Sequence, residues 1–130
     1  MKRIAIAAVV IVGTAASAAP AAAPRLSPHV YVAKITGANP AVLNATWRMA
    51  INRPLFSVTR NGRGAVIGQV RITGNRVTFQ DGTGSYACRG AQKSGTYTWR
   101  IVGKRLTLTR VRDSCVGRRI VFAHAFTVVV

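Results

Sequence analysis

The chain has 130 residues, and its 19 Lys and Arg stand against only 2 acidic residues, which gives a formal net charge of +17 at pH 7. The two acids, Asp81 and Asp113, lie far apart in the sequence, so a pair of catalytic carboxylates is not expected. A calcium or magnesium site would need more acidic ligands than this chain has. Because 49% of the residues are hydrophobic, the sequence is not that of a disordered polycation, and its length fits one domain.

Residues 1–18 are typical of a secretory signal peptide. A positively charged start precedes an apolar run over residues 4–16, and the small residues up to Ala18 form a cleavage site. We expect cleavage after Ala18, with cleavage after Ala21 as the alternative. An uncleaved membrane anchor is the other interpretation, but the run is shorter than the roughly 20 residues that a helical span needs. The mature form is therefore expected to be secreted, extracytoplasmic and not transmembrane.

Residues 19–43 are expected to form a flexible leader, because they begin with a stretch rich in Ala and Pro. Within this leader, residues 29–35 alternate weakly and could form a short strand. Residues 38–45 could form one helical turn, with Asn39 as its N-cap. The folded domain is expected over residues 44–130.

From Thr46 onwards, apolar and polar residues alternate with the period of a β-strand. Turn signals such as Asn61-Gly62 separate the alternating runs at intervals of about ten residues. The pattern predicts about eight short strands, which include one over residues 86–89 and a last one over residues 118–126. The apolar residues expected to face inward are Trp47, Met49, Ile51, Phe56, Val58, Val66, Val70, Ile72, Val77, Phe79, Tyr97, Trp99, Ile101, Leu106, Leu108, Ile120, Phe122 and Phe126.

These runs predict an all-β fold, a small antiparallel up-and-down barrel. Closing the sheet into a barrel removes exposed strand edges and gathers the apolar residues inside. A two-sheet sandwich of immunoglobulin type is the alternative, but sequential hairpins dominate the pattern.

Cys88 and Cys115 are the two cysteines of the chain. In an exported protein, two cysteines most simply form one disulfide. Free thiols or an intermolecular pair are the alternatives. Together with the distant His29 and His124, the cysteines do not match the spacing of zinc ligands, so no metal and no cofactor are expected.

The stretch Ala45-Thr46-Trp47-Arg48 resembles the G-x-W start of lipocalins and other calycins, with Ala in place of Gly. Further stretches similar to small secreted lipocalin-like proteins of bacteria, mostly without assigned function, are residues 95–99, 106–108 and 113–118. The resemblance covers roughly residues 44–126. It implies that Trp47 lies on the first barrel strand, at the closed end, and that a basic residue of the final strand packs over its ring. Arg118 is the matching position.

Groups suited to catalysis are few. His124 lies between Phe122 and Phe126, where a packed histidine is more common than a general base. Asp113 precedes the second cysteine among several arginines, so a local ion pair or turn cap is expected. No serine has an evident partner, and no phosphate-binding glycine loop is present. An enzyme is therefore not expected.

Three non-catalytic functions fit the sequence. The first is a carrier for a small apolar or anionic amphiphilic ligand, as calycin barrels often are, with a rim formed by Arg60, Arg110, Arg112 and His124. The second is a basic protein that binds polyanions or the cell envelope non-specifically, without specific nucleic-acid recognition, because the charge is high and spread over several strands. The third is a structural or interaction module. The sequence leaves the oligomeric state open.

Overall fold

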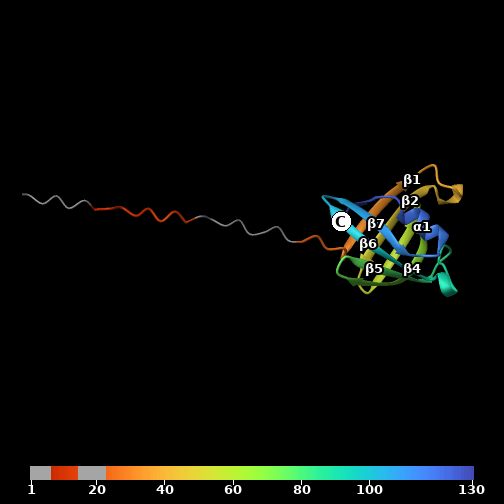
Figure 1. Cartoon of the computed structure of the whole chain (residues 1–130). Helices are drawn as coiled ribbons and strands as arrows, with labels where there is room; N and C mark the ends of the chain where they lie inside the picture. Colours follow the sequence, from red (N-terminus) through yellow and green to blue (C-terminus); the bar gives the residue numbers. More distant parts are fainter. Residues whose placement is uncertain (1–6, 15–22) are drawn as a thin grey trace, which may run out of the picture.

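The computed structural model describes residues 7–14 and 23–130 of the chain. Within them, eight antiparallel strands close into a barrel in which sequence neighbours pair and the last strand returns to the first (Figure 1). The strands are β1 (His29–Ile35), β2 (Ala45–Asn52), β3 (Leu55–Arg60), β4 (Arg63–Thr73), β5 (Arg76–Thr83), β6 (Ser94–Val102), β7 (Arg105–Arg112) and β8 (Phe126–Val128). The expected all-β antiparallel barrel is confirmed.

The two ends of the barrel differ in their connections. At one end, called the turn end here, tight turns join β2 to β3, β4 to β5 and β6 to β7. At the other, the loop end, longer connections contain the 3-10 helices η1 (Ala41–Leu43) and η2 (Gly90–Gln92) and the α-helix α1 (Val116–Phe122). The turn from β3 to β4 also lies at the loop end, and there Asn61 and Gly62 adopt φ angles of 49° and 80°. These left-handed conformations are what a two-residue hairpin turn requires.

Inward-facing side chains fill the barrel. The ring centroid of Phe79 lies 5.1 Å from that of Phe56, 6.2 Å from that of Tyr97 and 4.8 Å from that of Phe122, so one aromatic cluster joins three strands to α1. Gly68 on β4 makes room for this cluster, because a Cβ there would overlap the Phe56 ring and the backbone of β5. The predicted inward set is buried apart from four half-buried members, which are Ile72, Trp99, Ile101 and Ile120.

The barrel begins earlier than predicted. Residues 29–35, expected to belong to the flexible leader, form β1 and bury Tyr31 completely, so the folded domain starts well before residue 44. The alternation of this strand is weak because its outward residues Val30 and Val32 are also apolar, and both are half-buried. Lys34 is the polar outward residue of this strand, and one such residue does not show the alternating pattern of a half-buried strand.

The predicted strand over residues 118–126 is wrong, because most of this stretch is helix α1 and only its end reaches β8. Arg118, Val121 and Phe122 are buried at positions i, i+3 and i+4, which is the spacing of one helix face. The predicted strand over residues 86–89 is also wrong, since that stretch is a loop.

The predicted signal peptide lies largely outside the described residues, and so do both of its cleavage positions, after Ala18 and after Ala21. Among the helices in residues 7–14 and 23–130, none has the length and apolar character to cross a membrane.

Candidate functional site

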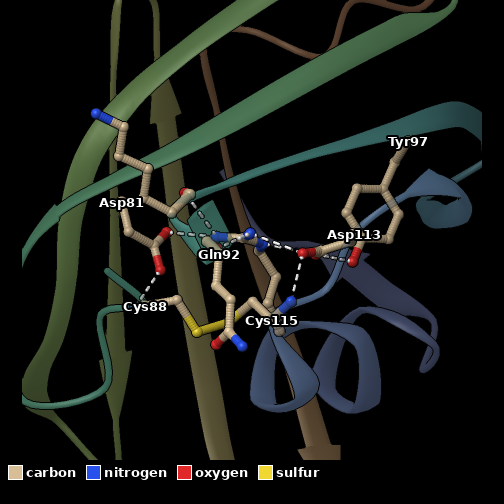
Figure 2. Close-up of a disulfide and its surroundings, with 8 residues drawn as sticks. Asp81, Cys88, Gln92, Tyr97, Asp113 and Cys115 are labelled. Carbon is tan, nitrogen blue, oxygen red and sulfur yellow. Dashed lines mark hydrogen bonds and ion pairs between the residues drawn. A yellow bond between two sulfur atoms is a disulfide. The ribbon is translucent and has the colours of Figure 1, made fainter. Parts of the chain in front are cut away.

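A buried cluster of charges lies at the loop end of the barrel. Arg118 on α1 is 7% exposed, and so are Asp81 on β5 and Asp113 in the connection from β7 to α1. The Nε and Nη2 atoms of Arg118 lie 2.7 Å and 2.8 Å from the two carboxylate oxygens of Asp113, which makes a bidentate pair. The Nη1 atom of Arg118 lies 2.9 Å from Oδ1 of Asp81. Figure 2 shows Asp81 and Asp113 on either side of this cluster.

The guanidinium of Arg118 is fully engaged. Besides the two acids, it donates hydrogen bonds to the backbone carbonyls of Gln92, at 3.0 Å, and Lys93, at 3.1 Å. A guanidinium has five N–H donors. Its five oxygen neighbours here come from Asp81, Asp113, Gln92 and Lys93, so no donor of Arg118 is left over for a ligand.

Asp113 is the more tightly bound of the two acids. In addition to Arg118, its carboxylate accepts hydrogen bonds from the Tyr97 hydroxyl and from the backbone N–H of Cys115, the latter at 2.9 Å. Burial alone would raise the pKa of Asp113, but the hydrogen bonds from Arg118 and Tyr97 outweigh burial and hold this pKa below its ordinary value. Gly95 on β6 leaves space for the carboxylate, because a Cβ at that position would lie 2.5 Å from Cγ of Asp113.

Asp81 is held by fewer contacts. It pairs with Arg118 and accepts a hydrogen bond from the backbone N–H of Cys88 at 2.8 Å. Burial outweighs both of these contacts, so the pKa of Asp81 is raised above its ordinary value. Asp81 is therefore the first of the two carboxylates to take up a proton as the pH falls.

The disulfide between Cys88 and Cys115 lies beside these charges (Figure 2). It joins the connection from β5 to β6 to the start of α1, which carries Arg118, and it confirms the predicted pairing. The two sulfur atoms and a carboxylate oxygen of Asp81 lie within 4.8 Å of one another. Because the sulfurs are bonded to each other and Asp81 is bound to Arg118, these atoms stabilise the fold rather than form a metal site.

A cavity of about 50 Å³ lies next to the charge cluster, under α1. Its walls are mostly apolar, with Asp81 and Arg118 on one side. The apolar residues that line it are Leu43, Trp47, Phe56, Val58, Val66, Tyr86, Val121 and Phe122. An engineered apolar cavity that binds benzene has about 150 Å³, and pockets for drug-sized ligands have about 300 Å³ or more. The closed barrel has room for only a very small molecule or a few waters.

Trp47 and Arg118 differ from what the lipocalin resemblance implied. Trp47 lies on the second strand, where its indole N–H donates to the Leu43 carbonyl at 2.9 Å. Arg118 lies on a helix instead of the final strand, and its guanidinium is bound to the acids. Within residues 7–14 and 23–130, the cation above an aromatic ring is that of Arg60, 5.6 Å from the Tyr86 centroid. The expected position of Arg118 on the last strand is therefore wrong.

The predicted rim residues do not form one site. Arg60 is half-buried and donates through Nε and Nη2 to the Val42 carbonyl, at 3.0 Å and 2.8 Å. Arg110 and Arg112 are exposed near the end of β7, and His124 is half-buried in the chain that follows α1. Arg60 therefore holds the connection from β1 to β2 in place through hydrogen bonds, whereas Arg110 and Arg112 on β7 are accessible at the surface.

The outer face of β4–β7 combines arginines with hydroxyl and amide side chains. Strand register places Arg71, Thr78, Thr96 and Arg112 in one row across the four strands, and the two threonine hydroxyls lie 2.9 Å apart. The exposed apolar side chains of Ile67 and Val102 also point outward from these strands. The polar outward side chains that make up the surface called the Arg–Thr face here are exposed or half-buried. They are Gln69, Arg71, Thr73, Arg76, Thr78, Gln80, Ser94, Thr96, Thr98, Arg100, Arg105, Thr107, Thr109 and Arg112.

Part of the Arg–Thr face is hollowed into an open groove of about 520 Å³. Arg71 on β4 and Arg53 in the turn from β2 to β3 supply its positive charges. Gln80 and Ser94 add an amide and a hydroxyl on the other side. This arrangement offers charge-assisted and neutral hydrogen bonds to the same anionic group.

A scan against protein-family models, a search of curated proteins and a search of solved structures found no match to this chain.

Proposed function

We propose that the protein is exported and binds an anionic polymer outside the cytoplasm through its Arg–Thr face. The observation that carries the proposal is the separation of charges. Both acids of the chain are buried against Arg118, so no Asp or Glu side chain is left at the surface to neutralise the other cations. Of the 19 Lys and Arg residues, Lys2 and Arg3 lie outside the described residues and Arg118 is buried, which leaves 16 exposed or half-buried.

The arrangement on the strands favours an extended polymer over a compact ligand. Neighbouring strands lie about 4.8 Å apart, so Arg71 and Arg112, three strand spacings apart in one row, span roughly 14 Å. A chain with repeated phosphate, sulfate or carboxylate groups contacts several such positions at once. Arginine suits this role because its fork of donors matches the oxygens of these groups.

Nucleic acid fits this surface less well than other polyanions. Proteins that bind single strands without sequence preference stack the bases on exposed aromatic side chains. In the described part of the chain, every Phe, Tyr and Trp is buried or half-buried. The surface therefore supports contacts to phosphate or sulfate groups and offers no platform for bases.

The disulfide and the signal-like start of the sequence support export. Disulfides persist in oxidising compartments outside the cytoplasm. There the available polyanions include phosphate-linked wall polymers and acidic polysaccharides.

The test is a titration of the full chain with poly(glycerol phosphate), heparin and single-stranded DNA at several salt concentrations. We expect saturable binding to the first two, with an affinity that falls steeply as salt rises. Weaker binding to DNA of equal charge density would agree with the missing aromatic platform. No binding to any polymer at low salt would contradict the function, and retention on heparin into molar salt would contradict its electrostatic basis.

A lipocalin-like carrier is the second candidate, supported by the eight-stranded barrel and by the cavity under α1. Because the cavity has only about 50 Å³, an amphiphile would enter only if α1 moved away. A fluorescent fatty acid should then bind saturably and change the emission of Trp47, which lines the cavity. Absence of saturable binding would remove this candidate and leave polymer binding unaffected.

A further inference from the structure

The barrel closes through the short strand β8, which leaves part of the edge of β7 without a partner strand. This unpaired part of β7, beyond Leu106, is called the seam here. β8 pairs with β7 only at Arg105 and Leu106. On its other side, β8 pairs with β1 at Tyr31 and Val32, and backbone hydrogen bonds from Val30 to Val129 and Val130 extend this contact. Beyond Leu106, β7 continues to Arg112 with no strand on its β8 side, because the chain there forms α1 instead.

The backbone groups along this unpaired edge can be assigned from the register. The Val128 N–H donates to the Lys104 carbonyl, so Lys104 directs its backbone toward β8. In an antiparallel strand, alternate residues direct their N–H and C=O to the same side. Leu108 and Arg110 therefore turn their N–H and C=O groups toward the seam, where no strand receives them.

An open groove of about 530 Å³ runs along the seam, between β7 and α1. Its floor is apolar, because it contains the buried side chains of Tyr97, Leu108 and Phe122. Arg110 from β7 and Arg119 from α1 lie along its sides. The volume falls within the range of about 300–1000 Å³ that is typical of binding pockets.

The charges around the groove are not neutralised within the fold. Asp81 and Asp113 are both bound to Arg118, and the described residues contain no other acidic side chain. Arg110 and Arg119 thus have no carboxylate side chain to pair with in the described barrel. A ligand that pairs with these two arginines must therefore carry the negative charge itself.

We propose that this seam binds an extended acidic segment of another protein, which adds to the free edge of β7 as a short strand. In strand addition, backbone hydrogen bonds supply affinity and alternate side chains supply specificity. The groove follows β7 from Thr107 to Arg110, about 13 Å, so it accommodates about four residues. Carboxylates of the segment pair with Arg110 and Arg119, and a small apolar side chain lies over Phe122. This partner is distinct from the polymer proposed for the Arg–Thr face.

The probe is a fluorescent, N-acetylated and C-amidated pentapeptide of alternating Glu and Val, titrated into the full chain at physiological salt. A peptide with Lys in place of Glu should not bind. A Glu/Val peptide with N-methylated alternate amides keeps its charge but cannot form the strand bonds, and we expect it to bind at least about tenfold more weakly. In hydrogen exchange, the peptide should protect the amides of Leu108 and Arg110.

Two variants of equal net charge separate the seam from general attraction. We expect Arg119→Glu to weaken peptide binding by about tenfold or more, and Arg71→Glu, on the Arg–Thr face, by about twofold or less. Arg110→Glu replaces Arg119→Glu if that variant does not fold. Equal losses in the seam and face variants would overturn the proposal, as would unchanged binding of the N-methylated peptide or no protection of Leu108 and Arg110. Binding of poly(glycerol phosphate), measured for the same variants as peptide binding, shows whether the Arg–Thr face is intact.

Discussion

The charge cluster at the loop end and the Arg–Thr face use the same residue type in opposite ways. Arg118 is 7% exposed and each of its N–H donors faces an oxygen of the protein. Arg71, at the β4 end of the row across β4–β7, is exposed and lies near hydroxyl and amide side chains but no acid. The chain thus uses both of its acids inside the fold, where they pair with Arg118. Its fold is stabilised by one arginine, and its surface remains available for anions.

Removing each of these two arginines in turn should reveal the largest difference between them. Arg118→Met leaves Asp81 and Asp113 buried without their cation, which costs about 3–5 kcal/mol of unfolding free energy. Arg71→Gln removes an exposed side chain and should change the unfolding free energy by less than about 0.5 kcal/mol. Urea unfolding of both variants measures the difference. If the two substitutions cost the same, the cluster does not stabilise the fold as described.

Removal of the disulfide should have the next largest effect on the unfolding free energy. Cys88 and Cys115 are 27 positions apart, and loop-closure entropy predicts a loss of about 3.5 kcal/mol when both are replaced by Ala. The loss should be accompanied by faster hydrogen exchange in α1 and η2, because the bond joins the two connections that surround Arg118. Thermal unfolding with and without a reductant provides the same comparison for the natural chain. A fall of less than about 1 kcal/mol would show that the charge cluster alone fixes the loop end.

A single methyl group offers a finer test of the packing around Asp113. In Gly95→Ala, the new Cβ meets the carboxylate group, so we expect a loss of about 1–3 kcal/mol from overpacking. Gly117→Ala is the matched control, because a Cβ at that position has open space and suits a helix. Unfolding of both variants by urea measures the contrast. An unchanged Gly95→Ala protein would mean that Asp113 can move without loss.

The pH dependence of stability distinguishes the two acids. The pKa of Asp113 is lowered in the folded state, so its contribution is present above the unfolded pKa of about 3.9 and is lost as the pH falls through the folded pKa. The unfolding free energy of Asp113→Asn should therefore fall less steeply at acid pH than that of the natural chain. The pKa of Asp81 is raised, so its contribution has the opposite sign and is lost as the pH rises through the folded pKa. Urea unfolding from pH 2 to pH 7 compares both Asn variants with the natural chain, and identical pH profiles would contradict this assignment.

The barrel could be predicted from the sequence because its strands from β2 to β7 alternate clearly and end in glycine turns. The structure of the two ends of the domain could not be predicted in this way. In β1 the outward Val30 and Val32 hide the alternation, and in α1 the apolar residues fit a strand and a helix equally well over so short a run. The position of Arg118 followed from the mistaken strand, and with it the expected contact to Trp47.

The charge cluster was predictable in part. The ion pair at Asp113 was expected from its neighbouring arginines. The core position of Asp81 could also have been found from the sequence, because Val77, Phe79 and Asp81 share the inward parity of one strand. The meeting of Asp81 with Arg118 depends on chain segments that approach only in the closed barrel, and no local pattern reports that contact.

The proposed function requires that Arg53 and Arg71, which line the groove of the Arg–Thr face, bind an anionic polymer more tightly than arginines elsewhere on the barrel do. The direct measurement is the affinity of Arg53→Gln/Arg71→Gln for poly(glycerol phosphate), compared with Arg48→Gln/Arg63→Gln, which removes the same charge elsewhere. We expect the first double variant to bind at least about tenfold more weakly with a lower salt dependence, and the second to bind about threefold more weakly or less. Equal losses in the two double variants would contradict it.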